Sequence, residues 1–174
     1  RVRDYSGERN DSRVQVDYLP VVDGHPMGQP GMPPRFDGND EWHVNSQVAY
    51  LPGTTDPLVT TSVAFVVDYT LVVQLEGTVP LRLSLGSRQP VFNFSLVRIT
   101  LPMNVTGDIE ANFGGALRAR NAARAVRAAG FCTIPEDTIA NALEFQADLP
   151  FDLLAPQNPT APCEALGFGA RLDL

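Results

Sequence analysis

The chain has 174 residues, 44% of them hydrophobic, and a formal net charge of −7. A chain of this length and composition can bury one ordinary core, which argues against wholesale disorder. The negative charge argues against nucleic acid as the main partner and leaves membrane association as peripheral at most.

The first 38 residues are predicted to form an extended, Pro/Gly-rich arm with one short strand. Val14, Val16 and Tyr18 alternate with polar residues, which is the pattern of that strand. Residues 19–38 then contain five prolines and four glycines, which exclude a helix or a central strand. If such a segment is ordered, we expect it to lie on a surface, either of its own chain or of a neighbouring subunit.

Residues 39–174 are predicted to form a single β-rich domain. Trp42 to Tyr50 alternates in polarity and predicts a second strand, with Trp42 as a core or interface anchor. Residues 58–101 are rich in Val, Leu, Phe and Thr and predict the central strands. The part before Gly77 is apolar on both faces, as in strands that are covered on both sides.

Two short helices are predicted to follow the central strands. Residues 115–130 are rich in Ala and Arg and lie between Gly114-Gly115 and Gly130, which are natural breaks. Thr133 and Glu136 have the spacing of a capping box and predict a second helix at about 134–145. The expected fold is therefore mainly β, an antiparallel sandwich or barrel-like sheet that could be jelly-roll-like, with a C-terminal helix pair.

Two further strands are predicted near the end of the chain. Residues 147–154 are expected to form an edge strand, followed by a Pro-rich loop at 155–162. Residues 168–174 alternate in polarity and predict a last strand. We expect that strand to pair with a sheet of its own chain or of a partner.

Arginines on the first predicted helix are candidate interface residues, together with Trp42. Arg120, Arg124 and Arg127 are spaced i, i+4 and i+7, so they share one helix face. Three interpretations stay open for this face. Local acids such as Glu136 neutralise it, another subunit binds it, or the helix start holds a phosphate.

The chain has two cysteines, Cys132 and Cys163, which are predicted to form one disulfide. A disulfide implies an oxidising location, which would be extracellular, periplasmic, in the cell envelope or on a virion surface. Free thiols are the alternative. His25 and His43 lack partners at metal-ligand spacing, so we expect no metal and no cofactor.

No motif of a catalytic site is present, including G-x-S-x-G, H-E-x-x-H, C-x-x-C and G-x-G-x-x-G. The first hypothesis is a non-catalytic structural or assembly subunit of an extracellular, cell-envelope or virion-like particle. Its arm and arginine face would contact other protein subunits. The alternatives are a barrel-like envelope module that binds an apolar ligand or lipid, and a hydrolase whose site is assembled from distant residues.

Overall fold

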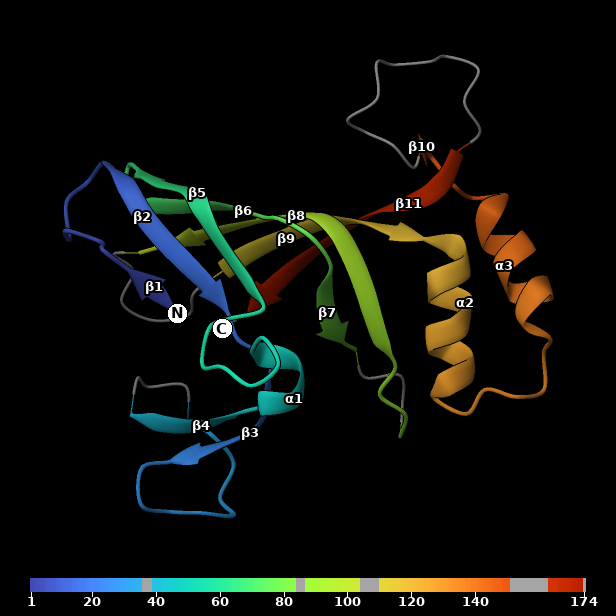
Figure 1. Cartoon of the computed structure of the whole chain (residues 1–174), viewed down its shortest axis with the longest axis horizontal. Coiled ribbons are helices and arrows are strands. Elements are labelled where there is room, and N and C mark those ends of the chain that lie inside the picture. Colours follow the sequence, from blue (N-terminus) through green and yellow to red (C-terminus); the bar gives the residue numbers. More distant parts are fainter. Residues whose placement is uncertain (36–38, 84–86, 104–109, 151–162, 174) are drawn as a thin grey trace. The chain divides into compact units, whose positions relative to one another are not determined.

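The fold is mainly antiparallel β-sheet with two short helices near the C-terminus, as predicted (Figure 1). The computed structural model describes residues 1–35, 39–83, 87–103, 110–150 and 163–173. The chain divides into two compact units. Unit 1 comprises Arg1–Leu75, Ile99–Ala111 and Leu172–Leu174, and unit 2 comprises Glu76–Arg98 and Asn112–Arg171.

Unit 1 contains an antiparallel sheet with the strand order β1-β2-β5-β6. Its strands are β1 (Val2–Arg3), β2 (Asp11–Tyr18), β5 (Val59–Val67) and β6 (Thr70–Leu75). The turn between β5 and β6 is made by Asp68 and Tyr69, whose φ angles are 50° and 57°. Two residues with positive φ are typical of a tight hairpin turn that matches the strand twist. The buried core of this sheet includes Val14, Ala64, Val66, Leu71 and Val73.

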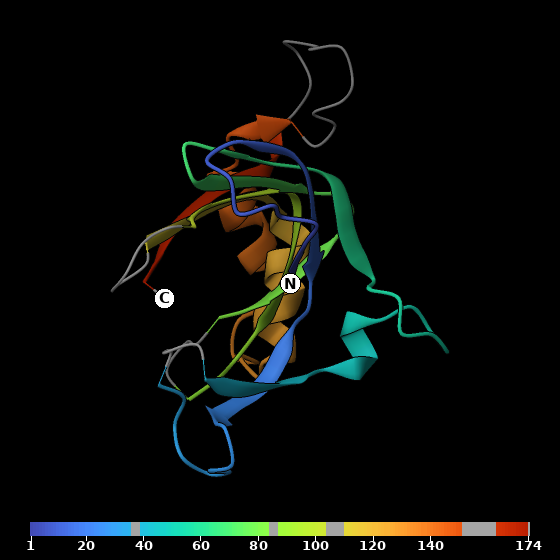
Figure 2. The same ribbon diagram turned by 90° about the vertical axis from the view of Figure 1, so that its left-hand side faces the viewer.

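A second, two-stranded sheet in unit 1 corrects the prediction of an extended arm with one short strand. Strand β3 (Val21–Pro26) pairs with β4 (Asp40–Val44), and the two strands lie side by side in both views (Figures 1 and 2). The described part of the first 38 residues thus contains three strands. Proline fits here because a two-stranded ribbon consists only of edge strands.

Gly24 and Trp42 explain how this β3–β4 ribbon packs. A Cβ atom on Gly24 would lie 2.4 Å from Cε3 of Trp42, so the indole ring can cross the strand only over a glycine. Trp42 remains 42% exposed. The ribbon therefore orders the leading segment by contacts within its own chain.

The predicted strand from Trp42 to Tyr50 is wrong beyond Val44. Strand β4 ends there, and Ser46–Ala49 forms the single helical turn α1. The N–H of Ala49 donates to the carbonyl of Asn45 at 2.9 Å. Asn and Ser favour turns and helix starts, and this local preference overrides the alternation of the side chains.

Unit 2 contains a second set of antiparallel strands around an aromatic core. In sheet order, β8 (Val91–Pro102) is followed by β9 (Glu110–Arg118), β11 (Cys163–Asp173) and β10 (Leu149–Pro150), and β7 (Val79–Arg82) also pairs with β8. The rings of Phe94, Phe113 and Phe168 have centroids 5.0 to 6.1 Å apart. These contacts join β8, β9 and β11. Of the predicted 147–154 strand, the described residues show a strand only at Leu149–Pro150, whereas residues 151–154 and the predicted loop at 155–162 lie outside the described residues.

The two helices of unit 2 are α2 (Ala119–Ala128) and α3 (Glu136–Glu144), and both are shorter than predicted. Strand β9 continues through Gly114-Gly115 to Arg118 instead of ending there. A Cβ atom on Gly115 would lie 3.3 Å from side-chain atoms of Phe94 and Val97, so this glycine allows close packing rather than a break.

The predicted capping box is not formed. Helix α3 begins after Pro135 without a side-chain cap, and the Glu136 carboxylate binds an arginine of α2 instead. No helix among the described residues is long and apolar enough to span a membrane.

Strand β5 is not covered on both faces, which corrects the expectation for residues 58–76. Val63, Phe65 and Val67 are 55%, 42% and 45% exposed, while Ala64 and Val66 between them are buried. A half-buried antiparallel strand shows this alternation of buried and open positions. The apolar run in the sequence therefore supplies both a core face and an open apolar face.

Candidate functional site

The predicted arginine face lies on α2 and is neutralised mostly within the chain. Helices α2 and α3 lie side by side (Figure 1), and Arg120 Nε is 3.1 Å from Glu144 Oε1. Arg124 Nε is 3.2 Å from Glu136 Oε1. The two arginine side chains are 62% and 69% exposed, so each ion pair contributes at most about 1 kcal/mol to stability. The structure therefore agrees with neutralisation by local acids.

Arg127 does not join the other two arginines. Its Nη1 donates to the carbonyls of Cys132 at 2.7 Å and Ile134 at 3.1 Å. A cation in this position satisfies free carbonyls beyond the helix end and interacts favourably with the helix dipole. Arg127 thus holds the loop between α2 and α3.

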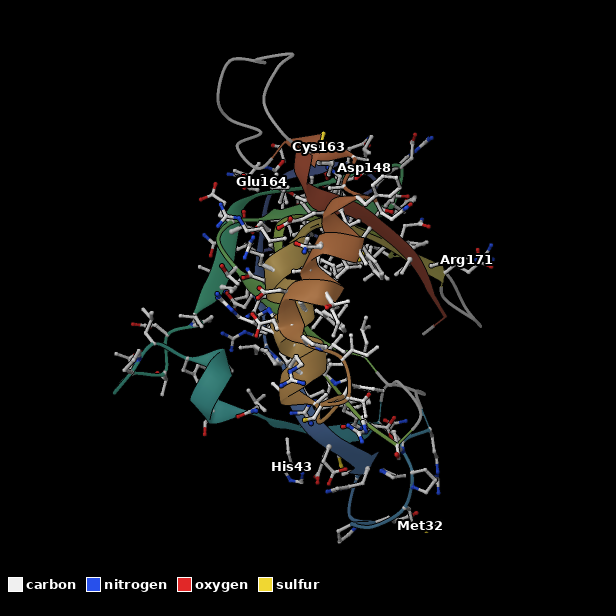
Figure 3. The ribbon with its side chains drawn as sticks, turned by 90° about the vertical axis from the view of Figure 1, so that its right-hand side faces the viewer. Met32, His43, Asp148, Cys163, Glu164 and Arg171 are labelled. Atoms are coloured by element: carbon white, nitrogen blue, oxygen red, sulfur yellow. The ribbon has the colours of Figure 1, made fainter. Side chains whose placement is uncertain are left out.

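A pocket of about 390 Å³ lies where the start of α2, the end of α3 and the start of β11 meet. Figure 3 shows Cys163 and Glu164 at this end of β11. The lining residues are Arg118, Arg120, Asn121, Arg124, Glu144, Cys163 and Glu164. The structure brings together three predicted site residues here, Arg120, Arg124 and Cys163. The lining is polar and charged, which suits hydrogen bonding to a polar group, and it lacks a histidine that could activate the thiol.

The predicted disulfide is wrong, because Cys132 and Cys163 are both free and exposed. Cys163 lines the pocket at the start of α2, whereas Cys132 follows the end of the same helix. A helix of ten residues is about 15 Å long, and a disulfide needs Cα atoms within about 7 Å. The free cysteines therefore give no support for an oxidising compartment.

The two histidines, which are isolated in the sequence, lie close together in the β3–β4 ribbon. Their ring centroids are 5.2 Å apart. His25 Nδ1 lies 3.0 Å from the carbonyl oxygen of Pro26 and 3.9 Å from Glu41, and His43 Nδ1 lies 3.9 Å from Asp23. The pairing of β3 with β4 brings the two rings together, and the spacing of His25 and His43 in the sequence does not indicate that pairing. Within the described ranges, no three His, Cys, Asp or Glu side chains are arranged to hold a metal ion.

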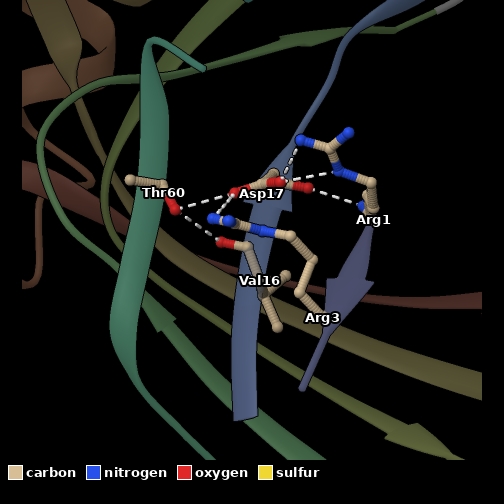
Figure 4. Close-up of polar contacts among 5 residues, drawn as sticks. All are labelled: Arg1, Arg3, Val16, Asp17 and Thr60. Carbon is tan, nitrogen blue, oxygen red and sulfur yellow. Dashed lines mark hydrogen bonds and ion pairs between the residues drawn. The ribbon is translucent and has the colours of Figure 1, made fainter. Parts of the chain in front are cut away.

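A buried carboxylate that the sequence did not reveal joins β1, β2 and β5 (Figure 4). The Asp17 side chain is fully buried and accepts hydrogen bonds from Arg1 Nε at 2.8 Å, Arg3 Nη2 at 2.8 Å and Thr60 Oγ1 at 2.9 Å. Burial raises the pKa of Asp17, but the hydrogen bonds from Arg1, Thr60 and Arg3 outweigh it and leave the pKa below its ordinary value. The cluster is a structural clamp between strands.

The side chains that cover Asp17 explain why the alternation in β2 did not reveal it. Asp17 lies opposite Thr60 of β5, and Arg1 and Arg3 bind its carboxylate from the neighbouring segment. Alternation in one strand indicates which residues share a face, but not which side chains cover that face.

Comparisons with known proteins give no further guide, because no family model, curated protein or solved structure matches the chain.

Proposed function

We propose that this protein is a non-catalytic structural subunit that assembles with other protein chains, in the first place with copies of itself. The observation that carries the proposal is the apolar stripe on β5, which consists of Val63, Phe65 and Val67. These side chains are 42% to 55% exposed and follow one another on one face of the strand. Val72 of β6 lies opposite Phe65 and widens the stripe. Contiguous apolar surface of this kind is typical of protein–protein contacts.

Charged side chains at one end of the stripe fit the same function. Arg9 Nη2 is 2.7 Å from Asp68 Oδ1, and both side chains are 66% exposed at the turn that follows β5. An apolar centre with a polar, hydrated rim is the usual composition of a protein interface.

The basis of the proposal differs from the one that the sequence suggested. The leading segment pairs with strands of its own chain, and Arg120 and Arg124 have acidic partners there as well. Neither feature therefore supports assembly. An extracellular, cell-envelope or virion-like location is part of the same proposal. The free cysteines do not support that location.

The apolar-ligand alternative finds less support than assembly. A pocket of about 700 Å³ is lined along residues 4–15 almost entirely by polar and charged side chains. The pocket beside α2 is also polar. An apolar ligand requires a mainly apolar lining, and neither of these two pockets has one.

A matched pair of phenylalanine substitutions tests the proposal. Phe65 is 42% exposed on the stripe, and Phe145 is 87% exposed at the end of α3. We expect Phe65→Ser to weaken self-association, measured by sedimentation velocity at about 1 to 100 µM, and Phe145→Ser to leave it unchanged. Circular dichroism checks that both variants fold. Equal association of wild type and folded Phe65→Ser would contradict a role for the stripe.

A further inference from the structure

The outer edge of β11 in unit 2 is open along part of its length. Strand β11 lies between β9 and β10, and β10 has only two residues. They pair as Leu149 with Ala165 and Pro150 with Cys163. Among the described residues, no strand pairs with this edge beyond that point.

Contacts of Asp148 show which backbone groups face this edge. The N–H of Asp148 donates to the carbonyl of Ala165 at 3.2 Å, and its Oδ1 accepts the N–H of Gly167 at 2.6 Å. Residues 165 and 167 therefore direct their backbone groups outward. Because every second residue of a strand does the same, Gly169 and Arg171 also direct their N–H and C=O groups to the open edge.

Apart from the Gly167 N–H, which Asp148 occupies, little in the side chains protects this edge. Gly167 and Gly169 are exposed, and a Cβ atom on Gly169 would meet nothing within 4 Å. Natural sheets commonly block an edge with Lys, Pro or inward-pointing charges, and residues 166–170 contain none of these. A row of outward backbone groups without such protection is a template for another strand.

The charged side chains near the open edge of β11 indicate which strand fits that edge. Figure 3 shows Asp148 and Arg171 towards opposite ends of β11. The Asp148 carboxylate takes the place of a side chain at Gly167, since Oδ2 would be 3.0 Å from a Cβ atom there. An antiparallel copy of the same strand, centred on Gly169, brings its Arg171 opposite Gly167 and hence beside Asp148.

We propose that two copies of this chain pair antiparallel through β11, with Gly169 of each copy opposite Gly169 of the other. This inference rests on the proposed function and names one of its interfaces. The two glycines exchange backbone hydrogen bonds, and the N–H of each Arg171 donates to the carbonyl of Gly167 in the other copy. A two-fold axis makes every contact occur on both sides, including the ion pair between Arg171 and Asp148. The five donors of a guanidinium allow this pair alongside bonds within its own chain.

A pair of substitutions at Gly169 tests the pairing. Gly169→Pro removes the outward N–H at an edge position that tolerates proline, whereas Gly169→Ala keeps the N–H and places its methyl group in open space. We expect sedimentation equilibrium to show a dimer for wild type and Gly169→Ala. In Gly169→Pro the dimer should dissociate at about tenfold or more higher concentration, because both symmetric hydrogen bonds are lost.

A charge exchange provides a second readout that does not depend on proline. Arg171→Asp and Asp148→Arg should each weaken the dimer, and the double variant should recover much of it. Thermal unfolding followed by circular dichroism confirms that each variant folds.

The results separate this inference from the proposed function. Equal dissociation constants for folded Gly169→Pro and Gly169→Ala overturn the β11 pairing. If wild type still associates and Phe65→Ser abolishes it, the proposed function stands without this interface. A wild-type chain that remains a monomer overturns both.

Discussion

At the scale of single residues, Asp17 is a buried polar side chain whose loss should destabilise unit 1. Asp17→Ala removes the acceptor of hydrogen bonds from Arg1, Arg3 and Thr60. The two arginines are about half exposed and can return to water, so the expected loss in free energy of unfolding is about 2 kcal/mol. Urea unfolding measures it, with the exposed Asp56→Ala as control. An equal free energy of unfolding in the two variants would show that the clamp does not stabilise the fold.

Asp11 and Asp17 predict how stability depends on acid pH. The pKa of Asp11 is lowered from 3.8 to about 2 by the Ser6 hydroxyl first, and then by the backbone N–H groups of Arg13 and Ser6. The pKa of Asp17 is lowered as well. Both groups have a lower pKa folded than unfolded, so their stabilisation is complete above about pH 4 and is lost as pH falls towards 2. Ser6→Ala should reduce this loss, and an unchanged pH profile of the unfolding free energy would contradict the assignment.

At the scale of elements, the end of α2 depends on a glycine and an arginine. Gly130 has a φ of 90°, and a Cβ atom there would lie 2.6 Å from Arg88 Nη1. Arg88 lies over the ring of Phe131 and donates to the carbonyl of Ala129 at 3.2 Å. Gly130→Ala should therefore lower the free energy of unfolding by about 1 to 2 kcal/mol, through backbone strain and the loss of this cap.

Gly53 provides the matched control for this prediction. It also has a positive φ, 76°, but a Cβ atom there would meet nothing within 4 Å. Gly53→Ala thus reports the backbone strain alone, at about 1 kcal/mol. If urea unfolding gave the same loss for both variants, the Arg88 cap would add nothing.

The elements also show how far local patterns predict a structure. Alternation in residues 58–101 correctly indicated paired strands, because burial of one face of a strand follows its two-residue period. The same reasoning missed β3 and extended β4 too far. The presence of β3 depends on its pairing partner, and the end of β4 depends on local turn preferences. A periodic pattern of side chains shows neither of these.

At the scale of the whole molecule, the sequence could indicate which residues share a face but not what covers that face. Arg120 and Arg124 do lie together, yet Glu144, which binds Arg120, is 24 positions away in a helix whose packing determines the pair. The cysteines illustrate the same limit, since Cys163 of β11 lies near the start of α2 and Cys132 follows the end of that helix. The β5 stripe appeared in the sequence as apolar residues, but its exposure depends on which face the sheet buries.

Self-association of the 174-residue chain is the property on which the proposed function depends. Native mass spectrometry of the wild-type chain at about 10 µM measures it most directly, because it counts the copies in each species. The account predicts dimers or larger assemblies at that concentration. Monomers alone, persisting up to about 100 µM, would contradict it.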